Sequence, residues 1–537
     1  MKNVRTWWRV ALIAVPITLL FSTGCRKEPA HPRWDIDLLA PLVTTSFTIR
    51  DLLADSLLDV AGDGSLTLLY RNELFGIRLD TLLDLPDTSF SYRFGLPFPG
   101  PLNLPAGATF FTNNETTELG VDEVQLRFLD VREGALDLEI TSMVASPTIG
   151  TFTIGSATLN GMPLSVERNV PAGTPGVPTT ESASSDLSGY HFDLRGPQLN
   201  TVNTLTTALT FKLDPNGGGA TLTDQDSVIA VAYYRGIVPE YALGYFGAPT
   251  YDVGPDTSRI DLFNDVISGI LDLDQVTATI TLTNGIGVDA RIVLHELSAA
   301  NTHTGQALTL QHAIVGGPIN LDRAIDLDGS FQSSVHQIVL DNGNSNIDAL
   351  VELLPDRLAY ALDLEVNPLG DISNGHDFLY HDSELHVDLD VSVPLRLITT
   401  DLTLQSIVRP DLPGTSGTHG LQHGTLHLFA TNGFPFTAAI LMDVIDPDGN
   451  VLTSIPVDGT VASGHVGSDG TVDMRTDSHL RAELTDAQVD LLYADTRLRL
   501  RTIFNTSDQS QHLQLLDSYR LDLQITAAAN YIVNGDD

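Results

Sequence analysis

Cysteine, lysine and long apolar runs are scarce in this chain. Cys25 is the one cysteine among 537 residues, and Lys2, Lys27 and Lys212 are the only lysines. A single thiol cannot close a disulfide within the chain, so disulfides contribute nothing to the expected fold. The formal net charge is −40, which would repel phosphate groups, and nucleic acid is therefore excluded as a partner.

The first 24 residues are predicted to be a signal peptide. Their apolar run, Val10–Phe21, is twelve residues long and contains Pro16, whereas a membrane-spanning helix needs about 20 apolar residues. Lys2, Arg5 and Arg9 precede the run, and this combination is typical of a cleaved signal. Removal of the segment, which carries three positive charges, leaves 513 residues with a net charge of −43.

The stretch "FSTGC", which ends at Cys25, resembles the lipobox of bacterial lipoproteins. The resemblance implies cleavage behind Gly24 and attachment of fatty acyl chains such as palmitate to Cys25, with residues 25–33 as a tether. Each buried methylene contributes about 0.8 kcal/mol, so two or three chains hold a protein firmly on a membrane. Ser22 stands where the motif prefers Leu, which leaves an ordinary secretory signal as the alternative. Since no Asp follows Cys25, the outer membrane is the expected destination, in either leaflet.

Apolar and polar residues alternate with a period of two along much of the chain, for example over Leu385–Val393 and Leu521–Ala527. Half-buried antiparallel strands have this pattern. Helical patterns are few and short, at 261–271 and from Thr485 onward. The sequence therefore predicts an all-β protein with two or more antiparallel, Ig-like β-sandwich domains and few short helices.

The mature length predicts two to four domains. We expect an N-terminal β domain at 34–260, a middle β-sandwich at 261–400 and a C-terminal β-sandwich at 401–537. Within the first of these, the Pro-, Gly- and Ser-rich stretch 169–189 has no apolar periodicity and predicts a long exposed loop. The alternating segment Val124–Thr141 predicts a β-hairpin that turns at Glu133-Gly134.

Two segments share a strand, a Thr-Asn-Gly tripeptide and a second apolar strand. The tripeptides begin at Thr283 and Thr431, 148 residues apart. Asn-Gly is typical of hairpin turns, because both residues accept a positive φ. Two explanations stay open, an internal duplication and two unrelated hairpins with the same turn chemistry.

A resemblance rests on three stretches, "WDIDLLAPLVTTSFTIRDLL" from Trp34, "TNGFPF" from Thr431 and "DSYRLDLQITAAANYIV" from Asp517. Together they resemble the uncharacterised cell-surface lipoproteins of Bacteroidota. The strand-Asn-Gly-strand unit is also similar to the Ig-like modules of late-embryogenesis-abundant proteins. Neither resemblance implies an activity, a cofactor or a set of functional residues.

Two histidine groups could in principle bind a metal ion. The candidates His376, His381 and His386 lie in "GHDFLYHDSELHVDLD" among several aspartates. A zinc site needs three or four converging ligands, whereas residues on one face of a strand lie almost 7 Å apart. The favoured interpretation is a solvent-exposed strand face that follows a polar turn. No metal or other cofactor is expected there. The second group, His419, His423 and His427, is interpreted in the same way.

Acidic turns are a third candidate feature. "DVIDPDGN" with Asp443, Asp446 and Asp448, and "IDLDGS" with Asp326 and Asp328, resemble fragments of calcium loops. Neither fragment has the ligand spacing of an EF-hand. Hairpin turns are favoured, with peripheral Ca²⁺ binding as the alternative.

The expected function is therefore a lipid-anchored outer-membrane protein with a non-enzymatic structural, adhesive or binding role. Its partners would be the membrane, through the N-terminal lipid, and a cell-surface protein or glycan. The alternative is a carrier or sensor of an apolar ligand in a β-rich cavity. A secreted hydrolase has the least support, because no catalytic motif is complete.

Overall fold

The computed structural model describes residues 33–51, 53, 57–78, 82–95, 100–121, 123–260, 266–412, 414–415 and 419–534. Antiparallel sheets make up nearly all of it, which confirms the predicted all-β class. The α-helices in these ranges are α3 (Ile347–Glu352) and α4 (Asp486–Tyr493), and neither is long and apolar enough to cross a membrane. The predicted signal peptide, Cys25 and all of the tether except Arg33 lie outside the described residues.

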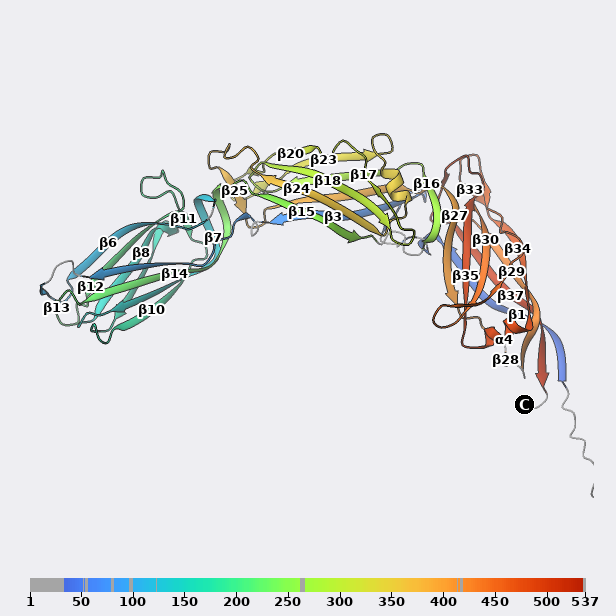
Figure 1. The fold of residues 1–537 in the computed structure, drawn as a ribbon, viewed down its shortest axis with the longest axis horizontal. Coiled ribbons are helices and arrows are strands. Elements are labelled where there is room, and N and C mark those ends of the chain that lie inside the picture. Colours follow the sequence, from blue (N-terminus) through green and yellow to red (C-terminus); the bar gives the residue numbers. More distant parts are fainter. Residues whose placement is uncertain are drawn as a thin grey trace, which may run out of the picture.

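The sheets form three bodies in a bent row, which we name the C-terminal repeat, the middle repeat and the distal domain (Figure 1). The C-terminal repeat contains β1 (Arg33–Thr48), β37 (Arg520–Asn534), β29 (His419–Asn432), β28 (Gly414–Thr415) and β34 (Thr476–Leu484) in one sheet, and β16 (Val266–Leu273), β27 (Arg396–Val408), β35 (Arg497–Thr506), β30 (Phe436–Ile445), β31 (Val451–Ile455) and β36 (Leu513–Gln514) in the other. The middle repeat contains β2 (Leu58–Val60), β3 (Leu66–Arg78), β26 (Glu384–Pro394), β17 (Thr277–Asn284) and β23 (Ser334–Asp341), facing β15 (Thr250–Arg259), β24 (Arg357–Val366), β18 (Ala290–Asn301), β19 (Gln306–Thr309) and β20 (Pro318–Leu321).

The distal domain is built on a ten-stranded sheet. Its strands are β4 (Thr88–Gly95), β6 (Thr109–Glu118), β7 (Gln125–Ser142), β8 (Thr148–Leu159), β9 (Met162–Val170), β10 (Thr179–Asp186), β11 (His191–Asp193), β12 (Thr204–Leu213), β14 (Ser227–Tyr245) and β25 (Asp377–Tyr380). Short two-stranded pairs complete the chain, namely β5 (Leu102–Leu104) with β13 (Ala220–Leu222), β21 (Ile325–Asp326) with β22 (Phe331–Gln332), and β32 (His465–Val466) with β33 (Val472–Met474).

The chain passes through each of the three bodies more than once. β1 pairs with β37, so the first and last described strands lie side by side in the C-terminal repeat. β2 and β3 belong to the middle repeat, and β4 to β14 build the distal domain. The chain then returns to the middle repeat, but β16 joins a sheet of the C-terminal repeat and β25 joins the distal sheet before β26. The sheets therefore do not follow the contiguous segments expected at 34–260, 261–400 and 401–537. Alternation identifies a strand but not its partner, and here the partners come from opposite ends of the sequence.

The middle and C-terminal repeats share one strand order. In each, the strand that ends at the Asn-Gly pair, β17 or β29, belongs to one sheet, and the next strand, β18 or β30, belongs to the other. The predicted hairpins are wrong, because β17 pairs with β23 and β26 rather than with β18. A short helix then precedes an equivalent strand in both repeats, α3 before β24 and α4 before β35.

A buried asparagine fixes the corner between the sheets in both repeats. Asn284 and Asn432 are each 0% exposed, and each side-chain amide donates to two backbone carbonyls while its oxygen accepts from the N–H two residues later. The bonds are Asn284 to Val288 (2.9 Å) and Asp322 (3.0 Å) and from Ile286 (3.0 Å), and Asn432 to Phe436 (2.8 Å) and Ala462 (2.9 Å) and from Phe434 (2.9 Å). This shared geometry favours the internal duplication over two unrelated hairpins.

The predicted hairpin over Val124–Thr141 is also wrong. β7 runs through Glu133-Gly134 as one strand, and both of its halves pair with β14. The pairing register shifts between Arg235 and Val238, beside Gly134, whose φ is +158°. The glycine therefore marks an irregularity in a continuous ladder, where a bend interrupts the alternation without reversing the chain.

Two further local predictions need correction and one is confirmed. In the predicted helix at 261–271, residues 266–271 belong to strand β16, which hydrogen-bonds to β27; residues 261–265 lie outside the described part. The predicted loop 169–189 contains β10, a polar edge strand on β7 that buries Ala183. The helix predicted from Thr485 is α4, and Thr485 forms a capping box with Gln488.

Apolar side chains continue from one repeat into the other. A cavity of about 40 Å³ at their junction is lined by leucines of both, including Leu68 of β3 and Leu402 of β27, together with Ile49 and Phe436. Polar edge loops would let the repeats move independently, whereas this shared apolar contact favours a fixed arrangement. The cavity has room for little more than a water molecule, far less than the roughly 300–1,000 Å³ of small-molecule sites.

Candidate functional site

An open hollow lies on the outer face of the middle repeat. It has a volume of about 710 Å³ and crosses β3, β26, β17 and β23. We name it the threonine groove after Thr277, Thr279 and Thr281, which follow one another along the outer side of β17. Residues between them, such as Ala278 and Ile280, are buried in the core, as period-two alternation requires.

Strand register arranges the groove in rows. Thr281 lies opposite Asp388 and Gln337, and Asp388 lies opposite Glu73. In the next row Thr279 lies opposite Asp390 and Val339, and Asp390 lies opposite Arg71. Four strands that are far apart in the sequence thus contribute to one polar surface.

The groove contains more negative than positive charge. Arg71 Nε lies 2.8 Å from Asp390 Oδ1, but both side chains are exposed, so this ion pair contributes little to stability. Glu73 and Asp388 are like charges directly opposite each other, an arrangement that disfavours the sheet. His386 bridges the neighbouring acids, with Nε2 3.4 Å from Asp388 and Nδ1 3.5 Å from Glu384.

The corresponding face of the C-terminal repeat carries rings. Counted back from the corner asparagine, Phe429 takes the place of Thr281 and His427 the place of Thr279. With His479 they form the ring cluster, in which Phe429 stacks on His479 at 4.5 Å and 7°. His427 Nδ1 lies 2.9 Å from His479 Nε2. Desolvation, followed by the charges of His479 and Arg481, lowers the pKa of His427.

The three histidines singled out from the sequence lie in separate surroundings. His376 is exposed and contacts Arg127 (3.3 Å), His381 donates its backbone N–H to Glu240, and His386 lies beside the groove. The predicted solvent-facing side of this strand is confirmed, since His386, Asp388 and Asp390 alternate with buried Leu385, Val387 and Leu389. Among the described residues no three His, Cys, Asp or Glu side chains are grouped to hold a metal ion.

The second histidine group also separates. His419, His423 and His427 belong to β29, where His423 pairs with Asp486 (3.1 Å) and His427 contacts His479 instead. The side chain of His419 is outside the described part.

The aspartates of the acidic turns form hydrogen bonds or ion pairs with nearby backbone groups and side chains. Asp446 accepts from the backbone of Asn450 at 2.8 Å, which closes the turn between β30 and β31. Asp443 lies on β30, 4% exposed, between Arg499 and Arg501 at 2.9 Å each. Burial would raise the pKa of Asp443, but hydrogen bonds from Ser454 and Arg499 and the charge of Arg501 hold it below its ordinary value.

Asp326 links the middle repeat to the distal domain. Its carboxylate accepts from the hydroxyl groups of Tyr241 (2.8 Å) and Tyr380 (2.7 Å), while the adjacent Asp328 donates its backbone N–H to Asp326. Burial, together with the bond to Asp326, raises the pKa of Tyr380 to about 12. Asp326 therefore acts as an anchor for two tyrosines.

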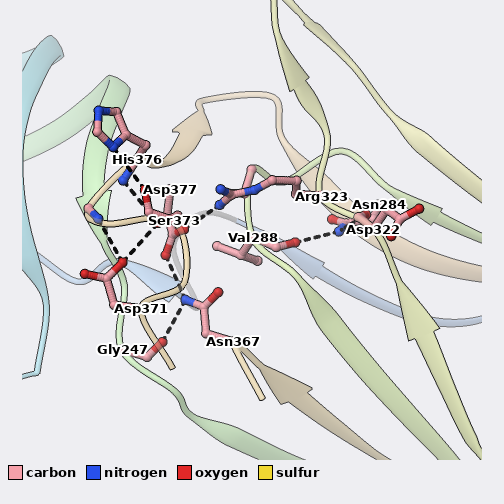
Figure 2. A network of polar contacts seen from close by, with 12 residues as sticks. Gly247, Asn284, Val288, Asp322, Arg323, Asn367, Asp371, Ser373, His376 and Asp377 are labelled. Atoms are coloured by element: carbon pink, nitrogen blue, oxygen red, sulfur yellow. Dashed lines mark hydrogen bonds and ion pairs between the residues drawn. The ribbon is translucent and has the colours of Figure 1, made fainter. Parts of the chain in front are cut away.

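A buried polar network holds the same junction (Figure 2). Asp377, 1% exposed, forms an ion pair with Arg323 and accepts from Asn367 Nδ2 at 2.8 Å. Asn367 also donates to Gly247 O at 3.0 Å. Asp377 opens β25, a strand supplied from the chain of the middle repeat to the edge of β14 in the distal sheet. The network and the shared strand favour a junction without free rotation.

Sequence reasoning identified the outward side of β26 but missed the groove. Thr277, Thr279 and Thr281 showed the same alternation as many other strands. What distinguishes these threonines is a comparison of the two repeats: Phe429 and His427 stand at the same distances before the second Asn-Gly pair as Thr281 and Thr279 before the first. That contrast has meaning only once both segments are placed in equivalent sheets.

No protein-family model matches the chain, and no curated protein sequence matches it. Among solved structures, the chain is similar to a protein from Parabacteroides distasonis ATCC 8503 that is provisionally described as secreted. The two share 10% identity, with 92% of this chain and 99% of that chain covered, and the TM-score is 0.27.

Proposed function

We propose that the protein is a lipid-anchored cell-surface protein with a non-enzymatic binding role, held to the outer membrane through Cys25. The observation that carries the proposal is the pairing of β1 with β37 in the body at one end of the row (Figure 1). β1 begins eight residues after Cys25, and eight residues span at most about 28 Å. The C-terminal repeat would therefore lie next to the membrane, with the distal domain far from it.

The pairing also suits a tethered strand. β1 is hydrogen-bonded to β37 from Arg33 to Thr48, next to the proposed tether. A pull on Cys25 along β1 would load this whole ladder rather than one terminal contact. The threonine groove, on the neighbouring body, supplies the surface for the binding role.

The apolar-carrier alternative has less support. The enclosed apolar space at the junction of the repeats amounts to about 40 Å³, too small for a fatty chain, whereas the threonine groove is open and lined by polar as well as apolar side chains.

Membrane fractionation of the wild type and of Cys25→Ala tests the proposal. The wild type should partition with the outer membrane, with an intact mass that corresponds to an acylated chain starting at Cys25. The variant should appear in the soluble fraction with unchanged circular dichroism. Equal membrane retention of the two proteins would refute the anchor.

A further inference from the structure

The threonine groove exists because small side chains occupy the centre of its sheet. Thr279 and Thr281 stand where the C-terminal repeat has His427 and Phe429, in an otherwise equivalent framework. In that repeat the rings fill the face, and Phe429 is stacked on His479. The hollow over these threonines has a volume of about 710 Å³, which is within the size range of ligand sites.

The polar groups in the hollow have unused capacity for hydrogen bonds. Within the described residues, no partner is found for the hydroxyl groups of Thr277 and Thr279, while Thr281 accepts only a long bond of 3.4 Å from Gln337. Glu73 and Asp388 are like charges at opposite positions of the register, an arrangement that is unfavourable. A ligand that donates hydrogen bonds to both carboxylates would relieve this repulsion.

Charge selects against acidic ligands. Glu73, Asp388 and Asp390 line the groove with Arg71 as the one guanidinium among its lining residues. The whole chain carries −40, which extends the same bias. Phosphates, sulfates and uronates would meet net repulsion here.

The backbone of the groove is already paired. β26 and β17 are interior strands, with neighbours on both sides, so their N–H and C=O groups are used within the sheet. A peptide lying across the groove would therefore find only side-chain partners for its own backbone groups. A carbohydrate, whose hydroxyl groups both donate and accept around its whole outline, matches carboxylates, hydroxyls and a guanidinium in rows. Val339, 50% exposed, and Leu69 add apolar contact for the C–H faces of sugar rings.

We infer that the threonine groove binds a neutral carbohydrate chain that lies across β3, β26, β17 and β23. Four strands at a spacing of about 4.8 Å give a length of about 14 Å, enough for about three linked pyranose rings. This inference rests on the proposed binding role and names its ligand class.

The test uses the full chain purified in detergent and a panel of neutral oligosaccharides, namely glucan, xylan and mannan fragments, with uronic-acid oligosaccharides for comparison. Binding is measured by isothermal titration calorimetry. We expect at least one neutral oligosaccharide to bind and the uronic-acid fragments to bind at least about tenfold more weakly, because they carry the repelled charge. Absence of binding across the panel, or a preference for uronic acids, would overturn the inference.

Two matched variants locate the site. Thr281→Phe introduces the ring of the other repeat and should weaken binding at least about tenfold by filling the groove. Phe429→Thr makes the reverse change on the other face and should leave binding unaltered. Wild-type affinity in Thr281→Phe with native circular dichroism, or loss of binding in Phe429→Thr, would contradict the assignment.

Glu73→Gln tests the same site without placing a bulky ring in the sheet. This variant removes one carboxylate from the repelling pair, so it should raise the midpoint of thermal unfolding while it weakens neutral-sugar binding several-fold. A purely structural role would change stability alone, and that result would count against the inference. Membrane fractionation of the cells that produce the same variants keeps the two proposals apart. A retained chain that binds no sugar contradicts only the ligand, whereas a released chain that binds contradicts only the anchor.

Discussion

The middle and C-terminal repeats have the same strand order and the same asparagine corner, yet their outer faces carry different chemistry. Asn284 and Asn432 make equivalent bonds with distances that agree within 0.1 Å. On the faces above them, threonines and carboxylates in one repeat replace the ring cluster of the other. The corner and core keep the fold, while the solvent-facing positions of the same strands are free to acquire a site.

The edges of the repeats differ as well. In the C-terminal repeat β36 stays within its own sheet, with Leu513 buried, whereas in the middle repeat β25 crosses to the distal sheet and begins with Asp377. β36 stays in its own sheet, and the C-terminal repeat lies at the end of the row. β25 pairs with the distal sheet instead, and the middle repeat is thereby joined to the next body.

The largest expected effect is at this crossing strand. Asp377→Asn removes one partner of a buried ion pair and should destabilise the junction by about 3–5 kcal/mol. Chemical denaturation should detect this as an earlier first transition. Asp363→Asn, which breaks the half-exposed contact with His295, is the control and should cost about 1 kcal/mol or less. Similar losses in the two variants would contradict the distinction between the crossing strand and an ordinary edge.

The corner asparagines test whether the repeats share a framework. Asn284→Ala and Asn432→Ala each leave buried carbonyl and N–H groups unpaired, at a cost of about 2–3 kcal/mol. Denaturant unfolding should give the same loss in both variants. Asn450→Ala, in the exposed β30–β31 turn, should cost less than about 1 kcal/mol. A large effect in one corner and none in the other would break the comparison.

The ring cluster should add stability that the threonine face lacks. Phe429→Thr removes the stack on His479 and should lower the free energy of unfolding by about 0.5–1.5 kcal/mol. Differential scanning calorimetry of the variant gives the value. A gain in stability would mean that the exposed ring of Phe429 destabilises the protein, which would contradict this prediction.

The carboxylate pair should have the opposite effect in the middle repeat. Glu73→Gln relieves the repulsion from Asp388 and should stabilise the protein by about 0.2–1 kcal/mol. Arg71→Gln, one row away, removes the ion pair with Asp390 and should slightly destabilise it. Thermal unfolding at low salt compares the two variants, and a change of the same sign in both would contradict the charge pattern.

The smallest effect concerns pH. The lowered pKa of His427 means that the folded chain prefers the neutral imidazole. Its contribution is complete above the unfolded pKa of about 6.5 and declines as the pH falls from there towards the lower folded value. Wild type should therefore lose slightly more stability than His427→Gln when thermal unfolding is followed across this window. Equal slopes would exclude the effect.

The sequence predicted the elements that depend on neighbouring residues. Thr485 and Gln488 marked the start of α4, and the alternation of Leu385–Val393 marked β26. It failed where a distant partner decides the outcome. Val266–Leu273 became a strand because β27 offers an edge, and Gly134 bends a ladder because β14 continues past it. The groove could not be predicted for the same reason, since its rows join residues that are as distant in the sequence as Glu73 and Asp388.

We have proposed that the C-terminal repeat holds the chain at the membrane and that the middle repeat carries its ligand surface. Hydrogen exchange of the full chain, with and without a bound neutral oligosaccharide, tests the claim most directly. We expect new protection in β3, β17 and β26 and unchanged exchange in β29, β34 and β37. Protection on the ring-bearing strands instead, or no change on either repeat, would contradict it.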